Sequence, residues 1–143
     1  MFQTNSVPDI SLPAYLKRVA WFLWCPTACF VIALEYVYRL SHLCPEVELN
    51  KYSVHQIVIT CVVVATKFID DKLFKNTFYA RIAGVSVKNI SAFEIRLVFF
   101  LKFDLLVLPE QYVARYESML RDNQGPDMVI IQPERIAAEG GVK

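Results

Sequence analysis

The chain has 143 residues, which suits one domain with a single hydrophobic core. Its formal net charge is +1, so it has neither the basic field expected of a nucleic-acid-binding protein nor an acidic run. Hydrophobic residues make up 55% of the chain and aromatic residues 13%, which is more than a typical soluble domain contains. This excess predicts an apolar surface that a membrane or a partner protein covers.

The membrane alternative fails on the length of the apolar segments. The longest uncharged run, 19–34, is only about as long as the shortest spanning helix, and Pro26 interrupts it. The N-terminal residues show no signal-peptide pattern, and Cys61 stands among valines as a reduced, buried cysteine would. We therefore expect an intracellular protein of the cytoplasm or nucleus, not a secreted one, whose apolar surface binds another protein.

The cysteines and histidines offer one conceivable metal site. Cys25, Cys29, His42 and Cys44 could in principle hold zinc. Their spacing lacks a CxxC pair, and they fall in apolar helical sequence. We therefore expect neither a metal nor another cofactor.

The N-terminal third predicts an extended arm and two helices. Residues 1–10 form the arm, and Ser11 with Pro13 can begin a helix that ends near Leu23. Pro26 breaks the chain, and a second helix is expected to end near Leu43. The apolar stripe predicted for this second helix consists of Phe30, Ala33, Leu34, Val37 and Leu40.

The stretch over 53–70 predicts the central helix of the fold. Ser53 and Gln56 have the spacing of a capping box, in which each side chain satisfies a backbone N–H at the helix start. The residues that follow are apolar on every side until Lys67. Such a helix is wrapped by other helices. Its β-branched residues would also suit a buried strand, but its length favours a helix.

The C-terminal half predicts three more helices. A short one is expected within 75–84, ended by Gly84, and an apolar one over 87–102. A last amphipathic helix starts at Pro109. We expect it to turn Tyr112, Val113, Tyr116, Met119 and Leu120 inward and Glu110, Arg115 and Glu117 outward.

The predicted fold is all-α: a five-helix bundle around the helix over 53–70, with a sixth amphipathic helix. Residues 1–10 are the arm, 11–121 the domain, and 122–143 a flexible tail with Gly, Pro and charge but no sustained periodicity. Within that tail, Met128 to Ile131 is apolar enough to dock on the domain.

Three stretches, taken together, carry a family resemblance over about residues 11–120. They are YLKRVAWFLWCPTACFVIALEYVYRL, NKYSVHQIVITCVVVATKFIDD and FKNTFYARIAGVSVKNISAFEIRLVFFLKFDLLV. In order and spacing they resemble a cyclin box, most closely that of the single-box P-type and U-type cyclins of the phosphate-pathway kind. The resemblance implies a bundle built around its third helix. It also implies a regulatory protein, not an enzyme, that binds and activates a cyclin-dependent kinase in the cell cycle or in nutrient or phosphate signalling.

The resemblance also implies which residues contact the kinase. Lys67 and Glu94 match the lysine and glutamate that form the polar centre of a cyclin's kinase interface. The apolar wall around them would consist of Val64, Phe68, Val98, Phe103 and Leu105. Of their neighbours, Phe99 is more often a core residue by its spacing. A wall of this kind could also pair with a second copy of the chain when no kinase is present.

Lys67 and Glu94 also have simpler interpretations. Lys67 can pair with Asp70 or Asp71 on its own helix. Glu94 can complete a capping box with Ser91 if its helix starts later than Val87. The residues alone favour these local roles, and the family resemblance favours the interface.

Two further positions concern the first helix. Arg18 matches an arginine that cyclins pair with an aspartate in the second helix, where this chain has Tyr38. A buried guanidinium would then need the Tyr38 side chain, or Glu35 one turn away, as its partner. By the same resemblance, Trp24 and His55 could form a substrate-docking groove, although core and helix-start roles are simpler.

Two other classes of function remain open at this point. One is a cyclin-fold scaffold of the transcription-factor kind, which binds proteins without activating a kinase and usually has two boxes and a basic surface. The other is a small helical enzyme. Against it, His42 and His55 are isolated, no Gly-rich phosphate loop occurs, and the only paired carboxylates are Asp70 and Asp71.

Overall fold

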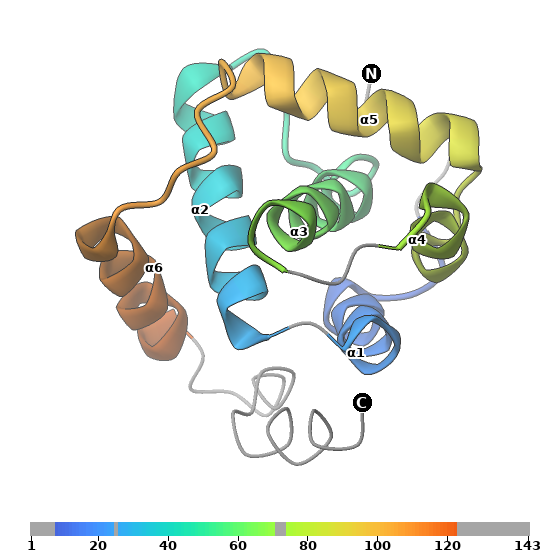
Figure 1. Cartoon of the computed structure of the whole chain (residues 1–143), viewed down its shortest axis with the longest axis horizontal. Helices are drawn as coiled ribbons and strands as arrows, with labels where there is room; N and C mark the ends of the chain where they lie inside the picture. The colour runs from blue at the N-terminus through green and yellow to red at the C-terminus, as the bar shows by residue number, and fades with distance from the viewer. Residues whose placement is uncertain (1–7, 25, 71–73, 123–143) are drawn as a thin grey trace.

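The computed structural model describes residues 8–24, 26–70 and 74–122. It has six helices, and those residues include no strand. The helices are α1 (Leu12–Leu23), α2 (Thr27–Leu43), α3 (Val54–Ile69), α4 (Asn76–Ala83), α5 (Val87–Phe100) and α6 (Pro109–Asp122). Helices α1, α2, α4 and α5 surround α3, and α6 lies outside α2 (Figure 1). The predicted all-α bundle with a central third helix is confirmed.

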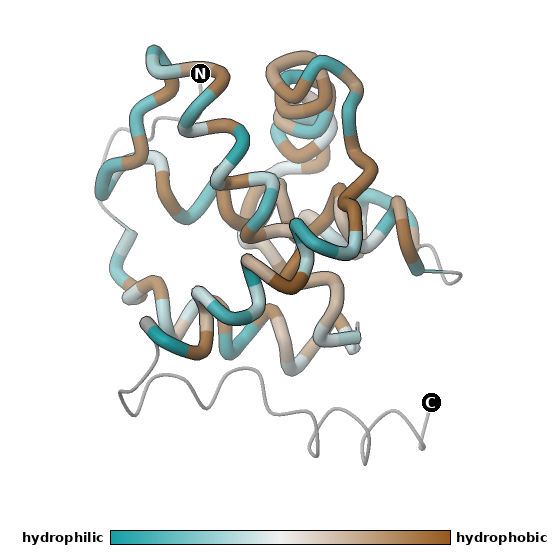
Figure 2. Tube along the Cα trace, turned by 90° about the vertical axis from the view of Figure 1, so that its left-hand side faces the viewer, coloured by the Kyte–Doolittle hydropathy of each residue, from teal (hydrophilic) through white to brown (hydrophobic). Residues whose placement is uncertain are grey.

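Helix α3 is central because nearly its whole circumference is apolar. Its residues from Ile59 to Thr66 are all buried. Two of them are polar, and each satisfies its hydroxyl within the helix: Thr60 donates to the Gln56 carbonyl and Thr66 to the Val62 carbonyl. The outer helices instead alternate hydrophobic and hydrophilic residues (Figure 2). The bundle therefore has one core, and α3 is its axis.

The predicted capping box at the start of α3 is wrong. The Ser53 hydroxyl makes no capping bond to the helix; it accepts from the Asn50 N–H at 3.1 Å and donates to the Glu48 carbonyl. The Gln56 Oε1 is buried without a hydrogen-bond partner. Ser53 therefore closes the loop before the helix, because that loop folds back within its reach.

Other helix ends lie where the sequence predicts them. Ser11 and Ser86 cap α1 and α5, with their side chains accepting from Ala14 N–H and Asn89 N–H. Gly84 ends α4 in the left-handed conformation, with φ of 74°. The apolar helix α5, however, ends at Phe100, two residues before the predicted end.

Helix α6 packs on α2, but not with all of the predicted face. Met119 is buried and Tyr112 is half-buried, whereas Val113 and Leu120 are exposed. Arg115, expected to face solvent, is half-buried because its guanidinium pairs with the buried carboxylate of Glu35. In α2 the expected stripe fails at Leu34, which is exposed, and Val37 is only half-buried; the other three residues are buried.

The predicted arm and the predicted tail lie largely outside the described residues. Ile10, at the end of the predicted arm, packs against the core, while residues 1–7 lie outside the described part. Helix α6 extends to Asp122, and the predicted tail from 123 onward, including Met128 to Ile131, also lies outside it. Each of the described helices is too short or too polar to span a bilayer.

Candidate protein-binding site

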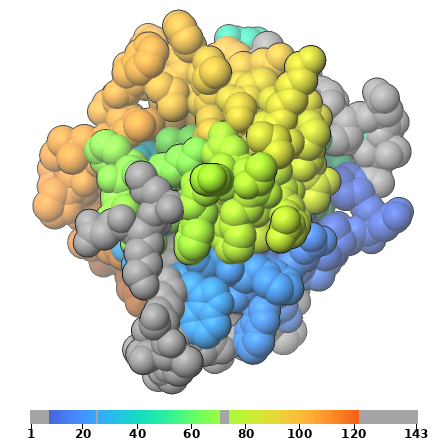
Figure 3. Space-filling view, turned by 45° about the vertical axis from the view of Figure 1, so that its right-hand side comes forward, coloured from blue at the N-terminus to red at the C-terminus, as the bar shows by residue number. Residues whose placement is uncertain are grey.

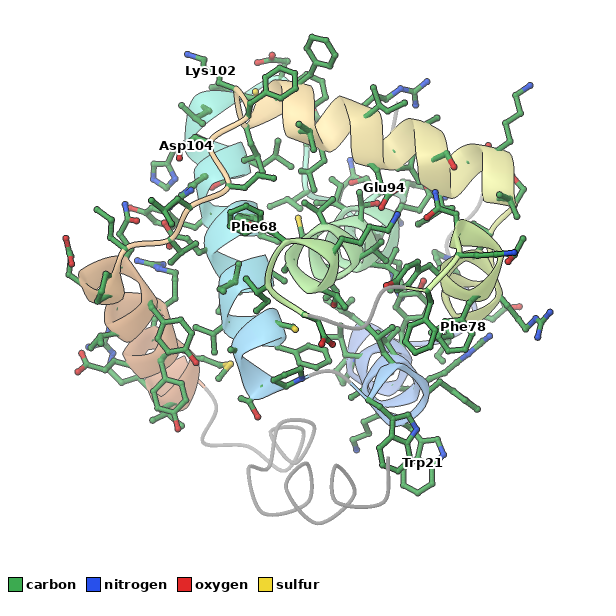
Figure 4. The ribbon with its side chains drawn as sticks, viewed as in Figure 1. Trp21, Phe68, Phe78, Glu94, Lys102 and Asp104 are labelled. Atoms are coloured by element: carbon green, nitrogen blue, oxygen red, sulfur yellow. The ribbon has the colours of Figure 1, made fainter. Side chains whose placement is uncertain are left out.

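The centre of the candidate site is an ion pair between two helices. The Lys67 ammonium, in the last turn of α3, lies 2.7 Å from Glu94 Oε1 in α5. The two side chains are 30% and 15% exposed. Glu94 lies on the side of α5 that faces α3 and α4 (Figure 4). The packing of α5 on α3 thus brings together the two charges that the family resemblance singled out.

Asn76, the first residue of α4, joins both members of the pair. Its side-chain oxygen accepts from Lys67, and its amide nitrogen donates to Glu94 Oε2 at 3.1 Å and to the Ser91 hydroxyl at 2.8 Å. The Lys67 ammonium also lies 5.2 Å from the centre of the Tyr79 ring. Sequence reasoning did not assign Asn76 to the site, although this residue stands within the stretch FKNTFYARIAGV that carries the family resemblance.

The capping-box alternative for Glu94 is wrong, whereas Lys67 has partners on other helices. Helix α5 begins at Val87 with Ser86 as its N-cap, so Ser91 lies inside the helix and cannot form a capping box with Glu94. Lys67 reaches across to α4 and α5 for its recorded partners. Asp71, the second acid proposed for Lys67, lies outside the described residues.

Apolar side chains extend outward from this ion pair. Phe68 is 49% exposed and Phe103 is 66% exposed, while Val98 and Leu105 are half-buried. Val64 is buried, so it supports this surface from below in the free chain. The structure adds exposed apolar residues that the analysis did not assign to the wall: Ile69, Ile95, Phe99, Leu106 and Leu108. For Ile95 and Phe99 the signal was their spacing of four residues, which places them on one face of α5.

The end of α5 turns Phe103 outward. Lys102 and Phe103 both adopt left-handed backbone, with φ of 55° and 59°, and the Phe103 N–H donates to the Val98 carbonyl at 2.9 Å. The Phe103 ring meets the Phe99 ring edge-on at 5.2 Å. Two consecutive left-handed residues that are not glycine cost about 1–2 kcal/mol each. The surrounding contacts must therefore favour this turn.

The surface view shows how these elements meet. The C-terminal end of α3 reaches the surface between α4 and the segment that follows α5 (Figure 3). Lys102 and Asp104 lie where α5 ends, while Trp21 lies on α1 at the opposite side of the molecule (Figure 4). Exposed apolar residues thus occur both at the end of α3 and in the segment that follows α5.

The structure does not bring together the two residues of the predicted docking groove. His55, in the first turn of α3, packs against the start of α1: its Nε2 is 2.8 Å from the Ile10 carbonyl and its ring is 5.2 Å from the Tyr15 ring. Trp24 ends α1 in left-handed backbone, about 13 Å further along the helix at about 1.5 Å per residue. His55 holds the chain before α1, as a structural residue would.

The first helix is not anchored through Tyr38. Arg18 is exposed, and its Nη2 donates to the Arg81 carbonyl at 3.3 Å. The Tyr38 ring instead receives the Arg115 guanidinium at 4.0 Å, and Glu35 pairs with arginines of α2 and α6. The prediction of a buried Arg18 served by Tyr38 or Glu35 is therefore wrong. The arginine joins α1 to α4 because α4 ends beside it.

No metal centre emerges from the described residues. They contain no group of three or more His, Cys, Asp or Glu side chains placed to hold a metal ion. Cys29 and Cys44 are buried, and Cys25 of the conceivable zinc set lies outside the described part.

Comparison with known proteins assigns the chain to a family. The family model described as Cyclin matches residues 1–105. The chain is 34% identical over 133 residues to Cyclin-U4-1 of Arabidopsis thaliana, covering 93% of this chain and 63% of that protein. It is 39% identical over 125 residues to Cyclin-U1-1 of Arabidopsis thaliana, covering 85% and 60%. It is 41% identical over 107 residues to Cyclin-P3-1 of Oryza sativa subsp. japonica, covering 75% and 45%. The chain thus spans less than two thirds of the length of these relatives.

Proposed function

The chain belongs to the cyclin family, of the P and U type, and we propose that it is a regulatory subunit that binds and activates a cyclin-dependent protein kinase. The observation that carries the proposal is the Lys67–Glu94 ion pair together with exposed apolar side chains at the end of α3 and after α5. In this role the chain is the partner of an enzyme and not itself one. It acts inside the cell, in the cytoplasm or nucleus, where such kinases work.

The ion pair supports the proposal because it keeps unused hydrogen-bonding capacity. An ammonium has three donors, and among the described residues Lys67 donates to Glu94 and Asn76 and lies over the Tyr79 ring. Each oxygen of Glu94 accepts one recorded bond and has a further lone pair. The pair can therefore donate to a main-chain carbonyl and accept from an amide at the end of a kinase helix. Charge-assisted bonds of this kind are the stronger ones.

The apolar wall supports the proposal because it would exclude water from those bonds. Phe68 follows Lys67 in α3 and Phe103 follows the end of α5, and both rings are about half or more exposed in the free chain. Aromatic side chains of this kind commonly act as the main anchors of protein interfaces. A kinase helix that lies on the wall would bury them and strengthen the polar contacts at its end.

Activation would follow from the position of that kinase helix. Active protein kinases require an ion pair between the glutamate of this helix and the catalytic lysine. A cyclin that binds only the inward position of the helix favours the active state by its difference in affinity between the two positions.

A capture experiment tests the binding claim. The tagged chain is incubated with extract of the native cell, and kinase protein and histone phosphorylation are measured on the beads. We expect the wild type to recover both, and the double variant Lys67→Ala, Glu94→Ala to recover neither. The matched control, Lys88→Ala with Glu117→Ala, removes the same charges from two exposed positions and should behave as the wild type.

Circular dichroism of each variant establishes that it is folded. Equal recovery by the wild type and the Lys67, Glu94 variant would show that the kinase contact lies elsewhere. Recovery of kinase protein by the wild type without activity would favour the alternative, a cyclin-fold scaffold that binds without activating.

A further inference from the structure

The segment between α5 and α6, residues 101–108, has no helix or strand of its own. It nevertheless carries some of the most exposed apolar side chains of the molecule, with Phe103 at 66% and Leu106 at 60%. Backbone bonds from Phe103 to Val98 and from Asp104 to Leu101 hold only the start of the segment, so the residues that follow need another element to hold them in place.

Helix α2 supplies that support by binding three consecutive carbonyls of the segment. Arg39 donates from Nη1 to the Asp104 carbonyl at 3.0 Å and from Nη2 to the Leu106 carbonyl at 2.9 Å. Between these two, the Tyr36 hydroxyl donates to the Leu105 carbonyl at 2.7 Å. The backbone is held on its inner side, so the side chains of Phe103 and Leu106 are free to face outward.

A buried acid orients the arginine that makes these bonds. Glu35 Oε1 lies 3.1 Å from Arg39 Nε, and its Oε2 lies 3.1 Å from Arg115 Nε of α6. The Glu35 side chain is only 6% exposed. One carboxylate oxygen therefore pairs with Arg39 of the same helix, α2, and the other with Arg115 of α6. Glu35 thus links the arginine that binds the segment to helix α6.

The start of α6 completes the arrangement. The Gln111 Oε1 accepts from Arg39 Nη2 at 2.9 Å and from the Leu108 N–H at 2.9 Å. The Arg115 guanidinium also lies 4.0 Å from the centre of the Tyr38 ring. The same polar network therefore holds the segment at Asp104 and at Leu108, directly after Phe103 and on both sides of Leu106.

We propose that Glu35, Arg39 and Arg115 are positioning residues that present the 101–108 segment to the partner protein. Helix α6 contributes Arg115 and Gln111 to this positioning. The identity of that partner rests on the proposed function. The positioning itself is a property of the free chain and can be measured without any kinase.

The variant Arg39→Lys tests the inference most sharply. It keeps the positive charge, but a single ammonium cannot reach the acceptors that a planar guanidinium spans. Arg121→Lys, at an exposed arginine of α6, is the matched control. Amide hydrogen exchange is measured on the full free chain, and the affinity for a purified cyclin-dependent kinase that the wild type binds is measured in parallel.

We expect the amides of Asp104, Leu108 and Tyr112 to exchange about tenfold faster in Arg39→Lys, while those of α3 keep the wild-type rate. The dissociation constant for the kinase should rise about tenfold, and Arg121→Lys should change neither quantity. An unchanged rate in the segment, an equal acceleration in every helix, or local acceleration with unaltered kinase affinity would each overturn the inference.

A second variant and a measurement that needs no kinase keep the inference testable. If Arg39→Lys does not fold, Arg115→Lys is used instead, because it leaves the bonds of Arg39 to the segment in place. In this variant the faster amide exchange is expected to begin at α6. If the wild type binds no kinase, the proposed function fails, and the exchange rates alone then decide whether the three residues position the segment.

Discussion

The Lys67 ammonium lies 2.7 Å from the Glu94 carboxylate, and the Asn76 side chain contacts both groups. The end of α3, the start of α4 and the middle of α5 therefore meet at one charged point. Because the apolar side chains of Phe68 and Phe103 extend away from it, the charges stand within a surface that a second protein can cover.

The two members of this pair should differ in their contribution to stability. Lys67→Ala leaves the less exposed charge, Glu94, with Asn76 as its recorded partner, whereas Glu94→Ala leaves Lys67 with Asn76 and the Tyr79 ring. We expect Lys67→Ala to lower the free energy of unfolding by about 2 kcal/mol and Glu94→Ala by about 1 kcal/mol. Urea unfolding measures both values. Equal losses, or an absence of coupling in the double-mutant cycle, would contradict this description.

The exposed phenylalanine at the end of α5 should matter for binding and not for folding. Asparagine tolerates the left-handed backbone of position 103, so Phe103→Asn removes the ring and keeps the turn. We expect the free energy of unfolding to change by no more than about 0.5 kcal/mol and kinase affinity to fall at least about tenfold. Leu49→Asn, at an exposed apolar residue before α3, is the control that should retain affinity. Equal kinase affinity of the Phe103→Asn and Leu49→Asn variants would show that Phe103 does not contact the kinase.

Tyr15 should make stability depend on alkaline pH. Its hydroxyl donates to the Ala83 carbonyl at 2.6 Å, and burial raises its pKa from 10.0 to about 12. Because the folded chain holds this proton more tightly than the unfolded chain, the stabilisation is complete below pH 10 and is lost as the pH rises towards 12. Tyr15→Phe should flatten that fall in urea-unfolding free energy and should cost about 1 kcal/mol at neutral pH. Burial also raises the pKa of Tyr36, so part of the slope remains. An identical pH profile in Tyr15→Phe would rule out this origin.

The loop before α3 offers a test between the predicted and the observed role of Ser53. A capping box would make Ser53→Ala and Gln56→Ala similarly harmful. Of these two side chains, only that of Ser53 bonds to the loop backbone, at Asn50 and Glu48. The Gln56 Oε1 has no hydrogen-bond partner among the described residues. We expect Ser53→Ala to lower the unfolding free energy by about 1–2 kcal/mol and Gln56→Ala to change it by less than about 0.5 kcal/mol. Matching losses in thermal unfolding would restore the capping box.

The predictable parts of this fold depend on local patterns. The apolar circumference of 54–69 indicated the central helix, and Ser11 and Gly84 marked helix ends, because caps and burial patterns are properties of neighbouring residues. The ion pair of Lys67 and Glu94 came from the family resemblance; the residues themselves favoured local partners for both.

The missed features depend on contacts between distant parts of the chain. Arg115 was predicted to face outward and Glu35 was named only as a possible partner of Arg18, because nothing in either stretch shows that α2 and α6 bring these two charges together. Asn76 reaches Lys67 and Glu94 only because three helices converge. Similarly, the left-handed turn at 102–103 contains no glycine or asparagine to signal it.

The most direct test of the central claim is the phosphorylation rate of a purified cyclin-dependent kinase that the wild-type chain binds, measured with increasing amounts of the chain. We predict a saturable increase in rate with the wild type and no increase with the folded Lys67→Ala, Glu94→Ala variant at the same concentrations. A kinase that binds the wild type but keeps its basal rate would contradict the activator role. Full activation by the double variant would contradict the role of the ion pair.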